Sequence, residues 1–474
     1  MKLTKSLLLA SAAGLAAVAT ASAADLPSKK AAPVEYVKVC PTYGPGFFYI
    51  PGTQTCIRVG GSATVYGYVA SKYTQGSTVA GSTHSDAINS DAEARIFLDA
   101  RDNTEYGLLR TFVRIQWVRS SGSDDNSGSQ PRRGQWFNSA GTTGYTRLQT
   151  GFQASNAYVQ LGGFLIGRTE SFAGPGLSAV QATLTQPSNG RVNQIAYTAA
   201  LGNGMSLTAA VEDAAEIREG IYGWTTAGQA TLTGDVIPNN VPDVVASFDV
   251  AQSWGTFKLA GVWHHVNVSP LDSASSKEGF AVTGYTKINL PMIAAGDNLQ
   301  LLASYGQGAA GRTIGNLTTD TNASNASGGQ GNAQWAVYDG AVIGTNGAAA
   351  TAAGPNKLVL STSYNVGAQF QHFFTPTVSA YLGGSFGKIT YGNQVKGSVG
   401  ASTSALVPRD GDMWGGELGV IWSPISGLEI NPSIAYRKQD ITRAPYTACP
   451  SNGFKTNVCS DDWYEARLRV ARSF

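Results

Sequence analysis

The chain has 474 residues and a formal net charge of +2 at pH 7, and 14% of its residues are charged. Soluble domains average about 25% charged residues, so this composition indicates that little of the folded surface faces water. The small net charge, without a run of lysine or arginine, argues against a nucleic-acid partner.

The first predicted element is a secretory signal peptide. Lys2 and Lys5 precede an apolar stretch at residues 7–18, and Ala21-Ser22-Ala23 forms a small-x-small cleavage pattern. Such a leader directs a chain to an oxidising compartment. The predicted organisation is a signal peptide at residues 1–23, an N-terminal periplasmic segment at residues 24–56 and a transmembrane barrel at residues 57–474.

The cysteines form two local pairs, Cys40 with Cys56 and Cys449 with Cys459. In an oxidising compartment this arrangement predicts two disulfides. The alternative is a metal site, but no histidine lies near either pair. We therefore predict no metal and no other cofactor.

Strand signals dominate from Ile57 onward, as period-two runs of about ten residues, the length that a tilted strand needs to cross a bilayer. In residues 358–370, Tyr364 and Phe370 fall on one face while Ser363 and Gln369 fall on the other. No segment after residue 23 reaches the roughly 20 apolar residues of a membrane-spanning helix. A membrane crossing would therefore use strands.

The connections between these runs alternate in length, seven short and eight long. One short connection is a predicted turn at residues 102–104, between strands at 91–101 and 105–119. Fifteen connections predict an all-β, sixteen-stranded antiparallel barrel with both termini on the periplasmic side. A soluble β-sandwich or a β-solenoid also alternates, but a solenoid should show a fixed repeat, and none is visible.

Three stretches carry a family resemblance: residues 157–172 with the step Gly167-Arg168, the segment from Cys40 to Gly61, and the terminal Phe474. Together they resemble the alphaproteobacterial porin family of general diffusion porins, over essentially the whole mature chain. The resemblance implies an outer-membrane homotrimer of sixteen-stranded barrels. It also implies that the third long loop folds inward, opposite basic residues of the barrel wall.

Strand alternation assigns a set of arginines to the lumen, because Leu109 and Val113 take the lipid face and leave Arg110 and Arg114 inside. A charged side chain on the lipid face would cost about 2–4 kcal/mol. The residues predicted at the pore constriction are Arg95, Arg110, Arg114, Arg467, Arg469 and Glu170. Those predicted in the vestibule, nearer the periplasm, are Arg58, Arg101 and Asp99. The arginine excess predicts a weak anion preference. Alternatively, these arginines form wall salt bridges with Asp99, Glu93 or Glu465.

We expect a porin in outer-membrane lipid that lets small hydrophilic solutes and ions diffuse through. One alternative is a substrate-specific channel for sugars or phosphate, hinted at by Tyr66, Tyr68 and Tyr381. Another is an outer-membrane β-barrel enzyme. No triad or paired-carboxylate constellation stands out near the four histidines, so we predict no enzyme.

Overall fold

The computed structural model describes residues 38–70, 75–79, 82–84, 88–121, 148–174, 177–178, 186–188, 190–222, 240–268, 274–315, 337–345, 355–395, 408–442 and 458–474. The chain divides into two compact units, Met1–Cys56 and Ile57–Phe474. The predicted signal peptide at residues 1–23 lies outside the described residues.

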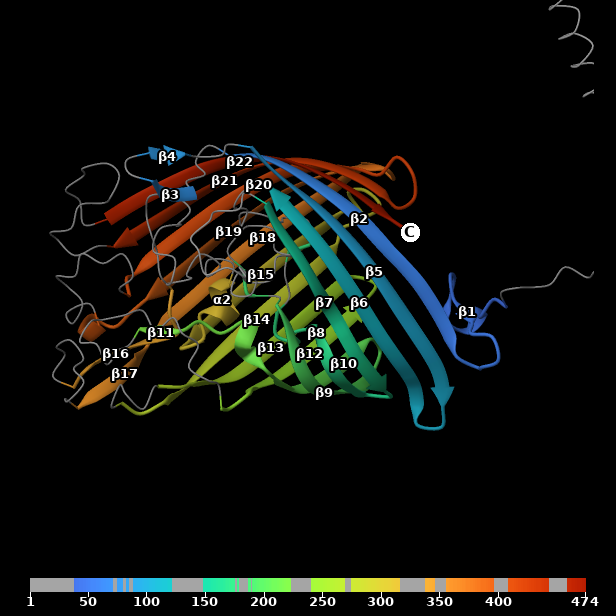
Figure 1. The fold of residues 1–474 in the computed structure, drawn as a ribbon, viewed down its shortest axis with the longest axis horizontal. Coiled ribbons are helices and arrows are strands. Elements are labelled where there is room, and N and C mark those ends of the chain that lie inside the picture. The colour runs from blue at the N-terminus through green and yellow to red at the C-terminus, as the bar shows by residue number, and fades with distance from the viewer. Residues whose placement is uncertain are drawn as a thin grey trace, which may run out of the picture. The chain divides into compact units, whose positions relative to one another are not determined.

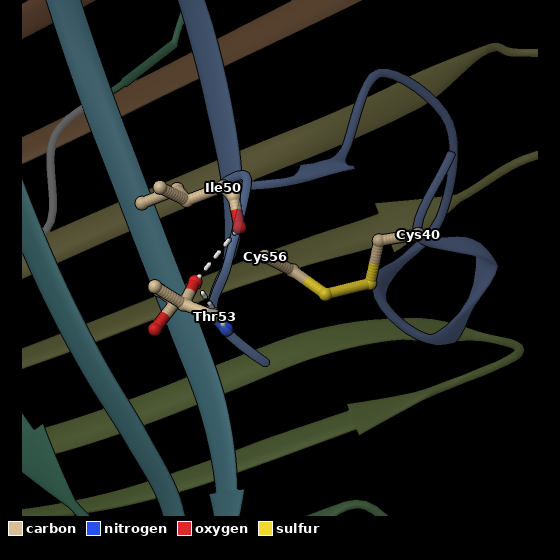
Figure 2. Close-up of a disulfide and its surroundings, with 5 residues drawn as sticks. Cys40, Ile50, Thr53 and Cys56 are labelled. Atoms are coloured by element: carbon tan, nitrogen blue, oxygen red, sulfur yellow. Dashed lines mark hydrogen bonds between the residues drawn. A yellow bond between two sulfur atoms is a disulfide. The ribbon is translucent and has the colours of Figure 1, made fainter. Parts of the chain in front are cut away.

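The N-terminal unit holds its fold with a disulfide rather than a large core. Cys40 is bonded to Cys56 across a Cα–Cα distance of 6.0 Å, which confirms this predicted pair (Figure 2). Both cysteines are buried with Phe47. Thr53 donates its hydroxyl proton to the carbonyl of Ile50 at 3.0 Å, which closes the turn before Cys56. The described part of this unit, residues 38–56, also contains the short helix η1 (Pro41–Tyr43) and the two-residue strand β1 (Phe48–Tyr49).

The second unit is a closed antiparallel barrel. Its sixteen strands in the described part of the chain are β2 (Cys56–Ala70), β5 (Ile88–Thr104), β6 (Gly107–Ser121), β7 (Leu148–Leu161), β8 (Phe164–Glu170), β9 (Arg191–Gly202), β10 (Met205–Glu212), β12 (Asp243–Gln252), β13 (Gly255–Val266), β14 (Lys277–Asn289), β15 (Asn298–Gln307), β18 (Thr362–Thr375), β19 (Val378–Thr390), β20 (Gly411–Trp422), β21 (Leu428–Thr442) and β22 (Val458–Ser473). Each pairs with the next, and β22 returns to β2 from Ser62↔Ser473 to Ala70↔Glu465. The predicted sixteen-stranded barrel is confirmed.

Short and long connections alternate around the barrel and gather at opposite ends (Figure 1). The long connection between β15 and β18 carries α2 (Gly311–Ile314), β16 (Gly340–Gly344) and β17 (Asn356–Leu360). The turn predicted at residues 102–104 is wrong, because the turn lies further along the chain. In the structure β5 continues to Thr104, which pairs with Gly107, so the turn is Glu105-Tyr106. Asp102 and Asn103 are paired with Leu109 and Leu108 and so belong to the strand.

Glycines make the tightest short turns possible. Gly204, at φ 73°, follows Asn203 between β9 and β10, and a Cβ there would lie 1.9 Å from the carbonyl oxygen of Ala251. Gly255, at φ 145°, begins β13, and its Cβ would lie 1.8 Å from the carbonyl oxygen of Lys287. Both positions combine a left-handed backbone with a close neighbouring strand, so only glycine fits without displacement.

The two barrel faces differ sharply in polarity. Side chains that point outward are apolar and exposed, among them Val65, Ile96, Val159, Leu259, Val366 and Leu418. Side chains that point inward include Gln116, Gln300 and Asn365, each at 0% exposure. Trp117, Trp263 and Trp414 stand on the outer face. This arrangement matches an apolar band in lipid around a polar interior.

The long connections carry small elements of their own. They are β3 (Gln75–Val79), β4 (Ser82–His84), η3 (Ala214–Glu216) and β11 (Ile221–Tyr222), besides α2, β16 and β17. β11, β16 and β17 form a three-stranded sheet, whose Ile343 packs in one buried cluster with Tyr391 and Met413 of the barrel end. Within the described residues, no helix has the length and apolarity to span a membrane.

Peptide mass mapping of the unreduced protein tests both disulfides. We expect a linked pair of peptides containing Cys40 and Cys56, and a second pair containing Cys449 and Cys459; Cys449 lies outside the described residues. In a Cys40→Ser variant only the first pair should disappear. Four alkylatable thiols in the unreduced wild-type protein would contradict the prediction.

Candidate pore constriction

A carboxylate shared by two arginines lies where β8 ends. Glu170 accepts a hydrogen bond from Arg114 Nη2 at 3.3 Å and another from Arg191 Nε at 3.0 Å. Its other oxygen accepts from Asn156 Nδ2 at 3.1 Å and from the hydroxyl of Thr169 at 2.9 Å. The Glu170 side chain keeps 47% of its surface exposed, so the cluster is open to solvent.

A β-bulge in β7 aims the residues of this cluster. Arg114 pairs with Asn156 and the next residue, Ile115, pairs with Ala154, which leaves Ser155 as an extra residue. The bulge lets Ser155 and Asn156 both turn inward, and both are buried. Arg114 Nε donates to the Ser155 hydroxyl at 2.9 Å, while Asn156 donates to Glu170. The bulge therefore connects the wall of β6 to the end of β8.

A second tier of charges lies nearer the short-turn end. Asp99 accepts two hydrogen bonds from Arg110, at 2.8 and 2.9 Å, and two from Arg101, at 3.1 and 2.7 Å. Arg101 and Arg110 are direct partners across β5 and β6. The sequence analysis predicts Arg101 in the vestibule and Arg110 at the constriction, because it places the β5–β6 turn too early. In the structure Arg110 shares a level with Arg101, and Arg114 lies deeper.

The remaining predicted arginines are paired singly along the wall. Arg95 forms an ion pair with Glu93, and Arg469 forms one with Glu429. Arg467 Nη2 lies 3.0 Å from Glu417 and is buried. Arg58 forms no ion pair with any described residue and lies over the ring of Phe97. The wall salt bridges considered for Glu93 and Asp99 are therefore present. A cavity of about 470 Å³ beside them is lined by residues that include Glu93, Arg95, Glu429 and Arg469.

Sequence alternation missed Arg191. Its neighbours on β9, Asn193 and Ile195, are exposed, so alternation would place Arg191 on the outer face with them. Arg191 pairs with Glu170 across β8 and β9, however, and its guanidinium reaches the same carboxylate oxygen as Arg114. The sequence signal that could have identified Arg191 is that Glu170 and Arg191 directly flank the long connection of residues 171–190.

A buried ionic cluster joins three long connections to the barrel. Arg312 of α2 donates to Asp243 Oδ2 at 2.7 Å from Nη2 and to the Ser171 hydroxyl at 2.8 Å from Nη1, and it lies 3.0 Å from Glu212. Glu212 ends β10 and Asp243 begins β12, while Ser171 follows β8. Arg312 itself is 3% exposed.

Charge balance explains why this cluster tolerates burial. Burial lowers the pKa of the Arg312 guanidinium, but Asp243 and Glu212 outweigh that effect and raise the pKa above its ordinary value. His264 extends the cluster, with Nδ1 2.6 Å from Asp243 and Nε2 3.6 Å from Asp339. Asp339 in turn accepts the backbone N–H of Ala310 at 2.7 Å, just ahead of α2. In the described part of the chain, no group of three or more histidine, cysteine, aspartate or glutamate side chains is arranged so that it could hold a metal ion.

The closed sixteen-stranded barrel, apolar outside and polar inside, defines an outer-membrane β-barrel of the porin class. A family model described as the porin subfamily matches residues 25–462, and the chain belongs to that family. This confirms the resemblance seen in the sequence. Proteins of this family are channels and not enzymes.

Two kinds of relative accompany this match. Porin Omp2b of Brucella suis biovar 1 (strain 1330) is 34% identical over 263 residues, which is 54% of this chain and 64% of Omp2b. Porin Omp2a of Brucella melitensis is 32% identical over 263 residues, 54% of this chain and 65% of Omp2a. The matches thus span less than two thirds of either relative. The crystal structure of the outer membrane channel DcaP of Acinetobacter baumannii has a TM-score of 0.55 at 13% identity, covering 89% of this chain and 97% of DcaP, which shows a shared fold.

Replacing Arg312 by methionine should destabilise the barrel. The substitution keeps much of the side-chain volume but leaves Asp243 and Glu212 buried without their guanidinium partner, a change that costs about 3–5 kcal/mol. Urea titration in detergent micelles, followed by tryptophan fluorescence, measures the free energy of unfolding. Arg472→Met, at an exposed position, is the matched control and should change it little. Equal stability of both variants would contradict the role given to Arg312.

Proposed function

We propose that this protein is a trimeric general porin of the Gram-negative outer membrane, through which small hydrophilic solutes and ions diffuse passively. The observation that carries the proposal is the cluster of Glu170 with Arg114 and Arg191, which joins the interior wall of β6 to the ends of β8 and β9. A charged and polar cluster on the inside of a barrel is typical of a water-filled interior. The two Brucella porins support the class of function, and we propose periplasmic termini because the short connections lie at the C-terminal end.

We propose that the third long connection, residues 171–190, folds into the barrel and narrows it. Several contacts support this. The backbone N–H of Ser178 donates to Gln300 Oε1 at 3.1 Å, and Gln300 Nε2 donates to the Ser178 hydroxyl at 2.7 Å. Leu177 packs with Leu302 and Tyr381. Gln300 lies on β15, five strands beyond β9 in the barrel order, and an inward path reaches it.

The constriction would carry an excess of positive charge. Glu170 is shared by Arg114 and Arg191, and Asp99 is shared by Arg101 and Arg110, so each carboxylate faces two guanidiniums. Guanidiniums stay charged at any physiological pH. Fixed positive charge along a narrow aqueous path raises the local concentration of anions. We therefore propose a weak anion preference.

Single-channel recording in planar bilayers tests the channel itself. Folded protein should insert and open ion-conducting steps, in groups of three if each trimer inserts as a unit. Heat-denatured protein from the same preparation is the control. Folded protein that inserts into bilayers without conducting ions would overturn the proposal.

The reversal potential in a KCl gradient tests the charge balance at Glu170. A unit charge acting at 4 Å contributes about 1 kcal/mol even in water, so removing one should change the anion-to-cation permeability ratio roughly two- to five-fold. Glu170→Gln should raise the ratio and Arg114→Gln should lower it. Glu278→Gln, at an exposed position where β14 begins, is the control and should leave it unchanged. Opposite shifts would refute the assignment of the constriction.

A substrate-specific channel is the second candidate, favoured by inward-facing aromatic rings on β5, β6 and β7. Liposome swelling with neutral sugars of graded size separates the two. A general porin should give rates that fall smoothly with solute size, because neutral sugars meet only the width of the constriction. Saturation of the rate for one sugar, but not for others of equal size, would favour the specific channel.

A further inference from the structure

Three aromatic rings form a stripe across neighbouring strands of the barrel wall. The ring centroids of Phe97 on β5 and Phe112 on β6 lie 5.8 Å apart, and those of Phe112 and Tyr158 on β7 lie 5.4 Å apart. The interplanar angles are 22° and 23°, so the three rings are nearly parallel. We call Phe97, Phe112 and Tyr158 the aromatic stripe.

The stripe lies on the interior face of the barrel. On β5, Phe97 alternates with the exposed, outward Ile96 and Leu98. Phe112 lies on the same face of β6 as Arg110 and the buried Gln116, and it pairs directly with Tyr158. A glycine clears space for the first ring, because a Cβ at Gly60 would lie 2.4 Å from Phe97 Cζ. The absence of a side chain at Gly60 thus leaves room for the ring of Phe97.

The rings remain accessible from the interior. All three are partly exposed, whereas a ring that only fills the wall would be buried, as Tyr381 is at 1%. The Tyr158 hydroxyl has no hydrogen-bond partner among the described residues, whereas Nδ2 of its wall neighbour Asn156 donates to Thr169 and Glu170. A solute in the barrel interior can therefore reach the exposed part of the rings and the free hydroxyl of Tyr158.

Guanidinium groups lie over rings at both ends of the stripe. Arg110 lies 5.2 Å from the Phe112 centroid and 5.6 Å from the Tyr158 centroid, and Arg58 lies 5.2 Å from that of Phe97. Arg114 follows Phe112 two residues further along β6, about 7 Å away at the rise of a strand. Arg110 shares one carboxylate with Arg101, and Arg58 has no carboxylate partner in the described part of the chain. Arg58 and Arg110 can thus each bind an anionic group.

We propose that the aromatic stripe and its bordering arginines form a binding subsite for aromatic carboxylates. The flat ring of such a solute extends the stack, and its carboxylate takes the charge-assisted hydrogen bonds that the arginines can still donate. A neutral sugar would leave the guanidiniums unused, and a saturated carboxylate would leave the ring faces unused. This subsite rests on the proposed channel function, because only a water-filled lumen gives solutes access to it.

The test compares two solutes of equal charge and similar size, benzoate and cyclohexanecarboxylate, as blockers of the single-channel current carried by KCl. Stacking on an aromatic side chain is worth enough that benzoate should bind about five-fold more tightly. A Phe112→Leu, Tyr158→Leu double variant should abolish this ratio while its open-channel conductance stays within the range of the wild-type protein. Tyr364→Leu, on the outer face of β18, is the matched control and should preserve the ratio.

Further outcomes separate the contribution of charge from that of ring surface, and the subsite from the porin function. Arg110→Gln should weaken binding of both carboxylates by a similar factor, since it removes charge and not ring surface. Equal blocking by benzoate and cyclohexanecarboxylate in a conducting wild-type channel would overturn the subsite and leave the porin function standing. An unchanged benzoate preference in the double variant would also overturn it. Failure of the folded wild-type protein to conduct at all would remove both proposals together.

Discussion

Backbone hydrogen bonding in lipid is the constraint from which the rest of this structure follows. Peptide groups inside a bilayer find no water, so every strand needs a partner on both sides and the sheet must close. Here β22 pairs with β2, and Phe474 and Gly61 exchange both backbone hydrogen bonds at 3.0 Å. Closure creates an inside and an outside, and strand alternation then sorts apolar side chains to the lipid and polar ones to the interior.

The interior holds many charged side chains because they are paired, some carboxylates with one arginine and others with two. Glu170 and Asp99 each accept from two arginines, and Arg312 is held by Asp243 and Glu212. Isolated buried ions are costly, whereas paired and hydrogen-bonded ones persist. Clusters of this kind serve two purposes. Those on the wall are proposed to set the electric field along the interior, and the Arg312 cluster fixes long connections to the strands that they follow.

The sequence predicts the barrel better than its interior. Strand number, alternating connections and the Cys40–Cys56 bond depend on local patterns, and these are confirmed. The β5–β6 turn was misplaced because Asp102 and Asn103 are typical turn residues that nevertheless pair as strand. Arg191 and the aromatic stripe were missed because they depend on strand register and on the bulge at Ser155, which neighbouring strands determine together. The pair Cys449 and Cys459, the constriction and the trimer stay predictions.

Glu170 belongs at once to the wall and to the base of the third long connection, because the same carboxylate holds Arg114 of β6 and Arg191 of β9. Under the proposed function, ion preference and the anchoring of that connection therefore depend on the same residue. Exchanging Glu170 would remove, in one step, the carboxylate proposed to act on permeating ions and the acceptor that Arg114, Asn156 and Arg191 share.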